Sequence, residues 1–157
     1  MTAAWRRLPP PARAIAVGTA AAVAAAGERD RDAFDTAVLS LATVEGSGLV
    51  LGAVVRLLVE ELHPDGVDGD DIRRILDRCV PAAAGWQPPV DQHTMLLLLA
   101  GALGIHDQDE ESAPPAPVVL TRHAVLLTAD LLAAGDRPLD PYLGAAFAEI
   151  QRTELQD

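Results

Sequence analysis

Residues 47–62 decide the fold of this chain, and they read SGLVLGAVVRLLVEEL. The stretch is longer than an ordinary β-strand. Between Leu49 and Val59, Arg56 is the one polar interruption of an otherwise apolar or glycine sequence. A helix that is apolar on nearly every side belongs at the centre of a helical bundle. We therefore predict a central helix over 47–62, with Ser47 as its N-cap.

Glycines, prolines and acidic N-cap residues divide the rest of the chain into further helices. The segments between them are rich in Ala and Leu, which are the best helix formers. Pro81 is expected to end the fourth helix, and the helix that begins at Asp91 is expected to be buried. The sequence predicts an all-α single domain over 1–157, a compact bundle or array of about seven helices. The six flanking helices are expected near 10–26, 31–45, 68–80, 91–103, 118–134 and from 140 onward.

Two parts of the chain share an ordered series of helix starts and stops. Thr36–Ala42 aligns with Thr94–Ala100, and in both copies a glycine follows four residues later. The order of helix, glycine, helix, glycine turn and acid-capped helix occurs over 30–80 and again over 90–155. This pattern predicts a duplicated three-helix unit with an extra N-terminal helix. Chance alignment of Leu- and Ala-rich helices is the alternative.

The chain carries a net charge of −11, and all 12 of its basic residues are arginine. A protein that binds DNA or RNA needs a positive face, so we expect no nucleic-acid partner. The absence of lysine is typical of a protein from a high-GC bacterium. Cys79 is the one cysteine, which excludes an intramolecular disulfide and fits a reducing compartment. We therefore expect a cytoplasmic location.

The N-terminal segment resembles a secretory signal only superficially. Arginines precede an Ala-rich apolar run, as in a signal peptide. The prolines at 9–11, the interruption at Gly18 and the absence of Leu and Phe from the run favour an ordinary helix. No apolar stretch reaches the roughly 20 residues of a membrane span. We expect neither export nor a membrane partner.

No motif in the sequence nominates an active site. Glu60 and His63 have the spacing found in di-iron bundles, but the equivalent positions of the second unit are Ala129 and Leu132. The acidic turn at 65–71 does not fit the register of a calcium-binding EF-hand. We expect no cofactor and no metal. The sequence favours a binding role over catalysis, while a catalytic site assembled from distant residues stays open.

Apolar helices in excess of one small core predict an interaction surface. Three nearly apolar helices compete for the centre of the bundle, and the surplus would be covered by a protein partner or a second copy. Self-association through the first or the sixth helix is the specific hypothesis. Trp5 and Trp86 are candidate interaction residues, because tryptophan is enriched at interface hot spots. Covering the ends of the bundle is their structural alternative.

The alternative function is that of a small-molecule-binding helical regulator or enzyme, with an apolar pocket between the two repeat halves. Its candidate polar groups are Arg56, Arg122 and His123, each embedded in an apolar helix. A charged residue in such a place must be paired or functional. Residues 106–117 are acidic and rich in proline, which predicts a mobile surface loop.

Overall fold

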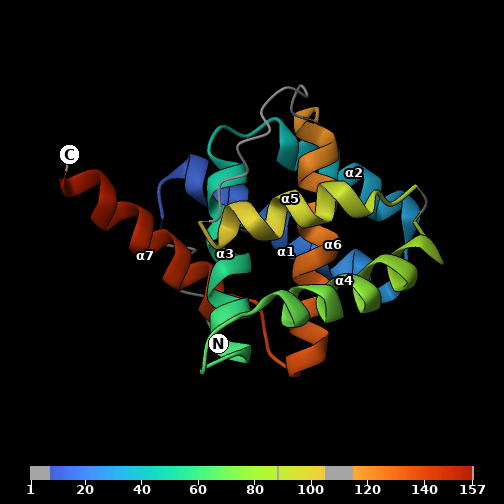
Figure 1. Ribbon diagram of the computed structural model, residues 1–157. Coiled ribbons are helices and arrows are strands. Elements are labelled where there is room, and N and C mark those ends of the chain that lie inside the picture. The colour runs from blue at the N-terminus through green and yellow to red at the C-terminus, as the bar shows by residue number, and fades with distance from the viewer. Residues whose placement is uncertain (1–7, 88, 105–114, 157) are drawn as a thin grey trace.

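The computed structural model describes residues 8–87, 89–104 and 115–156, and these form helices and no strands (Figure 1). The prediction of an all-helical chain is therefore confirmed. Trp5 and most of the predicted acidic loop at 106–117 lie outside the described residues. The helices are α1 (Pro10–Glu28), α2 (Arg31–Ala42), α3 (Ser47–Leu62), α4 (Gly69–Ala84), α5 (Gln92–Ala102), α6 (Pro117–Gly135) and α7 (Asp140–Gln156).

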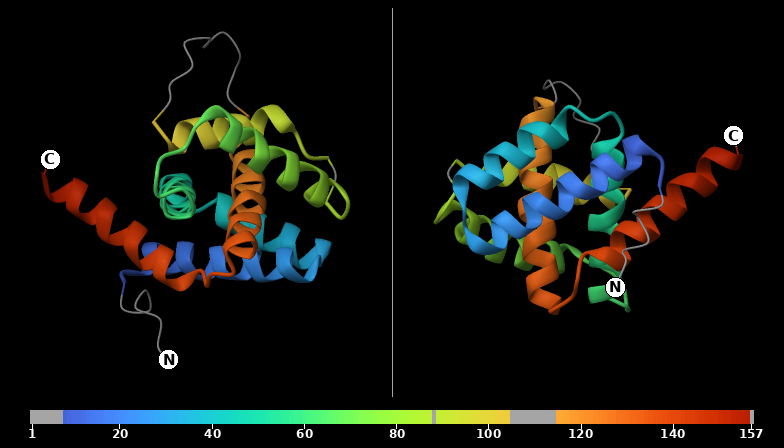
Figure 2. Two further views of the ribbon diagram at one scale, coloured as in Figure 1. Left: turned by 60° about the horizontal axis from the view of Figure 1, so that its bottom comes forward. Right: turned by 180° about the vertical axis from the view of Figure 1, so that it is seen from behind.

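The helices are arranged in three layers (Figure 2). α1 and α2 lie side by side on one face, α4 and α5 lie on the opposite face, and α3 and α6 cross between them. α6 contacts all of the first five helices, which makes it the centre of the bundle. α7 packs on α3, and its C-terminal part projects away from the other helices (Figure 1).

Aliphatic side chains from every layer fill the core around the crossing of α3 and α6. Tyr142 and Phe147 also pack in or against this core, and the rings of Phe34 and Trp86 meet edge to face with their centroids 5.2 Å apart. Burial of this apolar surface is the main stabilising term for such a bundle. The largest fully buried apolar side chains are Phe34, Leu41, Leu51, Leu58, Met95, Leu99, Leu127, Leu131 and Leu143.

Two helix boundaries differ from those expected. α4 continues through Pro81 to Ala84. Pro81 and Asp77, whose carbonyl loses its helical partner, are both exposed, so water can replace the missing hydrogen bond. Ser47 is not the N-cap of α3. Gly46 takes that position with a φ of +90°, a left-handed conformation that glycine adopts readily, and the chain bends by 115° between α2 and α3.

α5 is less buried than its run of leucines predicts. Met95 and Leu99 are buried, but Leu96 is 40% exposed, and Leu97 and Leu98 are half-buried. The centre of the bundle is already occupied by α3 and α6, so α5 lies in an outer layer and covers them with one face. Part of its apolar surface is therefore left at the edge of the molecule.

The two predicted repeat halves pack in a reciprocal way. α2 of the first half contacts α6 of the second, and α5 of the second half contacts α3 of the first. α4 contacts α6 as α7 contacts α3, so these pairs also correspond. The correspondence ends at the contact between α4 and α5. Its counterpart would be a contact between α7 and α2, but α1 packs along α2 instead. The duplication itself stays a prediction.

The central position of α6 accounts for its apolar composition. By length and composition α6 could cross a membrane, contrary to the expectation that no stretch is long enough, and half of the segment concerned is buried inside the bundle. α2 and α3 pass the same test only when taken together, across their 115° bend.

Candidate functional site

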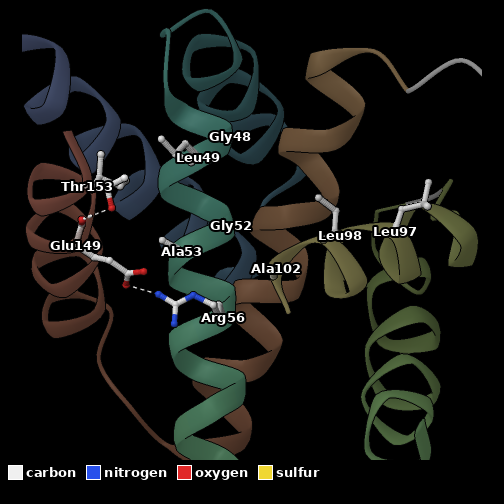
Figure 3. A pocket seen from close by; sticks show the side chains of 12 residues that line it. Gly48, Leu49, Gly52, Ala53, Arg56, Leu97, Leu98, Ala102, Glu149 and Thr153 are labelled. Carbon is white, nitrogen blue, oxygen red and sulfur yellow. Dashed lines mark hydrogen bonds and ion pairs between the residues drawn. The ribbon is translucent and has the colours of Figure 1, made fainter. Parts of the chain in front are cut away.

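A groove of about 620 Å³ runs along one face of α3, between α5 and α7 (Figure 3). α3 forms its floor and the other two helices form its walls. The groove therefore lies between the two predicted repeat halves, where the sequence placed an apolar pocket. We refer to it as the α3–α5–α7 groove; its lining is Gly48, Leu49, Gly52, Ala53, Arg56, Leu97, Leu98, Gly101, Ala102, Glu149, Ile150 and Thr153.

Gly48 and Gly52 leave the floor of the groove open. They are four residues apart and so lie on the same face of α3. A Cβ atom added to either glycine would meet no other atom within 4 Å, whereas at Gly18 of α1 it would meet Leu41 at 3.2 Å. Glycine within a helix costs about 1 kcal/mol relative to alanine. No packing contact among the described residues requires that cost at positions 48 and 52.

The α5 wall of the groove is aliphatic, and the α7 wall combines Ile150 with the polar residues Glu149 and Thr153. Leu49, beside the floor, is 63% exposed, while Leu97 and Leu98 of α5 and Ile150 of α7 are half-buried. Large exposed aliphatic side chains are ordinary when scattered singly. Here one exposed and three half-buried aliphatic side chains surround one concave surface, which is the usual form of a binding surface.

One end of the groove is polar. Arg56 is half-buried there and donates hydrogen bonds to Glu60, one turn along α3, and to Glu149 of α7. Burial alone would lower the pKa of Arg56, but hydrogen bonds and charge attraction from Glu60 and Glu149 outweigh it and raise that pKa. The guanidinium is thus paired with two carboxylates. It links α7 to α3 and so positions one wall of the groove.

The other two sequence candidates, Arg122 and His123, lie away from the groove. His123 is buried, its Nδ1 lies 2.8 Å from the carbonyl oxygen of Val119, and its Nε2 accepts the Asp91 backbone N–H at 3.0 Å. These partners assign a neutral imidazole with the proton on Nδ1. Burial is the largest cause of the lowered pKa of His123. This histidine ties the start of α5 to α6.

Arg122 holds the connector between α4 and α5 against α6. Its guanidinium donates to the carbonyl oxygens of Gln87, at 2.6 Å, and Pro89. Burial lowers the pKa of Arg122. Because both partners are backbone carbonyls, the charge is used to fix the chain rather than to present a cation to a ligand. Arg122 and His123 thus act as structural groups.

The connector is also fixed by side chains that the sequence did not single out. Gln87 is 2% exposed, donates to Asp35 at 2.5 Å and accepts from Arg31 at 3.2 Å. Trp86 is half-buried against Phe34. Trp86 therefore packs against the core, and its role as an interaction residue stays a prediction. A glutamine in a loop carries no local sign of burial, and only its partners on α2 reveal this role.

Other sites on the chain offer less. Burial raises the pKa of the Cys79 thiol to about 12, so the thiolate needed for nucleophilic chemistry is suppressed. In a second hollow, beside Tyr142, the lining residues Glu61 and Arg137 are paired with each other at 2.5 Å. Within the described ranges, no group of three His, Cys, Asp or Glu residues is placed to hold a metal ion.

A smaller cavity of about 260 Å³ adjoins the groove behind Leu98. It shares Gly48, Gly52 and Leu98 with the groove, and Ser47 and Thr121 contribute hydroxyl groups to its lining.

Comparison with known protein families, with curated proteins and with solved structures finds no match for this chain. Its function must therefore be inferred from its own geometry.

Proposed function

We propose that this chain is a non-catalytic, helical protein-interaction module whose α3–α5–α7 groove binds the apolar face of a helix from a protein partner. The observation that carries this proposal is the open glycine floor of the groove. At Gly48 and Gly52, a Cβ added to the backbone of α3 would meet no side chain within 4 Å among the described residues. Glycine at such positions permits another backbone to come close.

The dimensions of the groove suit a short stretch of helix. Gly48 and Arg56 are eight positions apart, which is about 12 Å along α3 at 1.5 Å per residue. Two helical turns present three apolar anchors with helical spacing on one face. Leu49, Leu97 and Ile150 supply apolar contacts on both sides of the floor. An apolar helix face is therefore the natural occupant.

A small apolar ligand is the second candidate. The groove volume of about 620 Å³ falls within the usual range of ligand pockets, and the cavity behind Leu98 would accept part of such a molecule. Ligand pockets also present a few convergent polar groups that fix orientation. Arg56, the one cation lining the groove, is already paired with two carboxylates. This pairing favours the protein partner.

Filling the floor tests the proposal. Gly52→Leu would place a side chain in the groove, whereas Gly144→Leu makes the same change at another helical glycine, on α7, where an added Cβ also meets nothing and which does not line the groove. Both variants remove a glycine from a helix, so neither should lower the melting temperature. Affinity capture from the source cell, with wild type and both variants as bait, then compares what each retains.

The expected result is a partner retained by the wild type and by Gly144→Leu and lost with Gly52→Leu. The same captured proteins for all three baits would contradict a role for the groove. A small-molecule role instead predicts that denatured wild-type protein releases a low-molecular-weight apolar compound, detected by mass spectrometry, that denatured Gly52→Leu does not.

A further inference from the structure

A second exposed surface of the chain, on α1, is similar in length to the groove. Ala14, Val17, Ala21 and Ala24 are all exposed, and their spacing of three and four residues places them on one straight seam. Val17 is 51% exposed and stands between the alanines. The opposite side of α1 packs on α2 and α6. We refer to these four residues as the α1 seam.

The seam and the groove have similar lengths. Ala14 and Ala24 are ten positions apart, or about 15 Å at 1.5 Å per residue, against about 12 Å for the groove floor. Alanines facing the glycines of α3 would allow the two helix axes to approach closely. Val17 would then provide the larger apolar contact within the walls.

Charge favours one orientation of α1 in the groove. Arg56 and Glu149 line the polar end of the groove, and Glu60, just outside the lining, also pairs with Arg56, so two carboxylates lie beside one guanidinium there. Arg13 is exposed at the start of the α1 seam, and the first turn of α1 holds no acidic residue. If α1 runs antiparallel to α3, its positive N-terminal end meets these carboxylates and the negative C-terminal end of α3.

We propose that the α3–α5–α7 groove is occupied by the α1 seam of a second copy of this chain. This inference rests on the proposed function and names its partner. α1 lies in an outer layer of the bundle, while the groove opens between α3, α5 and α7 (Figures 2 and 3). The contact therefore joins two different surfaces. Such a head-to-tail contact forms a closed ring or an open filament.

A mixing experiment tests this contact. Val17→Glu places a negative charge on the seam but leaves the groove intact, and Gly52→Leu fills the groove but leaves the seam intact. Sedimentation velocity of each variant alone should show a monomer, whereas the wild type should assemble with rising concentration. An equimolar mixture should form a dimer and stop there, because each pair keeps one functional seam and one functional groove.

Leu39→Glu is the matched control for Val17→Glu. Leu39 of α2 is 59% exposed and belongs to neither surface, so this variant should assemble like the wild type. Circular dichroism melting of all variants separates loss of assembly from loss of folding. The proposal is overturned by a wild type that stays monomeric, by single variants that still assemble, or by a mixture of folded variants that does not pair.

The failure of this inference differs from the failure of the proposed function. A monomeric wild type whose captured partner is lost with Gly52→Leu keeps the groove as a binding site and shows that a different protein occupies it. If Gly52→Leu still assembles and still captures the same proteins as the wild type, both the proposed function and this inference are wrong.

Discussion

Replacing Thr19 by valine gives a direct measure of the packing of α1. Thr19 is fully buried, and its hydroxyl has no hydrogen-bond partner among the described residues. A buried hydroxyl without a partner costs about 1–3 kcal/mol. Valine has the same branched shape and carries a methyl group in place of the hydroxyl. Thr19→Val is therefore expected to raise the free energy of unfolding by about 1–2 kcal/mol. The gain is smaller than the full cost of the hydroxyl because the neighbouring side chains do not adjust completely to the new methyl group.

Thr128 of α6 provides a matched control. It is also fully buried, but its hydroxyl donates to the backbone carbonyl of Ala124 at 2.7 Å. Thr128→Val removes a satisfied hydrogen bond, which contributes about 0.5–1.5 kcal/mol, and adds an apolar methyl group. That change should leave stability unaltered or lower it by about 1 kcal/mol. The two valine variants should thus differ by about 1–3 kcal/mol in favour of Thr19→Val.

Urea unfolding followed by far-ultraviolet circular dichroism provides the assay. Equal slopes for the wild type and both variants would show that the difference in midpoint reports stability alone. In thermal unfolding, Thr19→Val should melt about 2–4 °C higher for each kcal/mol gained. A Thr19→Val variant no more stable than Thr128→Val would refute the reasoning, because it would mean that the Thr19 hydroxyl is satisfied in solution.

Two further predictions concern the stability of the fold at acid pH and the C-terminal end of α1. Burial holds the pKa of His123 below its usual 6.5, so the unfolded chain binds a proton first. The free energy of unfolding should fall below pH 6.5, by at most about 1.4 kcal/mol per pH unit. Urea unfolding between pH 7 and 5 should show a shallower fall for His123→Gln than for the wild type. An equal fall would contradict a lowered pKa of His123. Arg29 ends α1 with a φ of +55°, a left-handed conformation that is costly for any residue but glycine. Arg29→Gly should therefore raise the free energy of unfolding by about 1 kcal/mol, whereas Glu28→Gly, inside the helix, should lower it by about the same amount.

The sequence alone determined which segments are helical, because helix formation depends on neighbouring residues. Ala and Leu favour the helix at each position, and acidic residues satisfy the free N–H groups at its start. Asp68 and Asp71 form a reciprocal capping box at the start of α4, and Asp91 caps α5. The predicted start of α3 was one residue too late, because the left-handed backbone of Gly46, where the chain turns between α2 and α3, makes Gly46 and not Ser47 the N-cap.

The sequence predicted an apolar pocket between the two repeat halves, and the α3–α5–α7 groove lies there, but two of the three candidate polar groups, Arg122 and His123, do not line it. Surplus apolar surface followed from the composition, and Arg56 was a natural candidate because it interrupts an apolar helix. Self-association through the first or the sixth helix stays a prediction; α6 contacts five other helices, and half of its apolar segment is buried inside the bundle. Among the described residues, the large exposed aliphatic side chains lie on α1, α2, α3 and α5.

Only the tertiary structure decided the groove itself. Its polar end depends on the ion pair between Arg56 and Glu149, which are 93 residues apart, and its walls depend on how α5 and α7 pack against α3. These long-range contacts are set by the packing of whole helix faces, which no local pattern of residues specifies. The glycines at 48 and 52 are visible in the sequence, but that they face open space follows only from where the neighbouring helices lie.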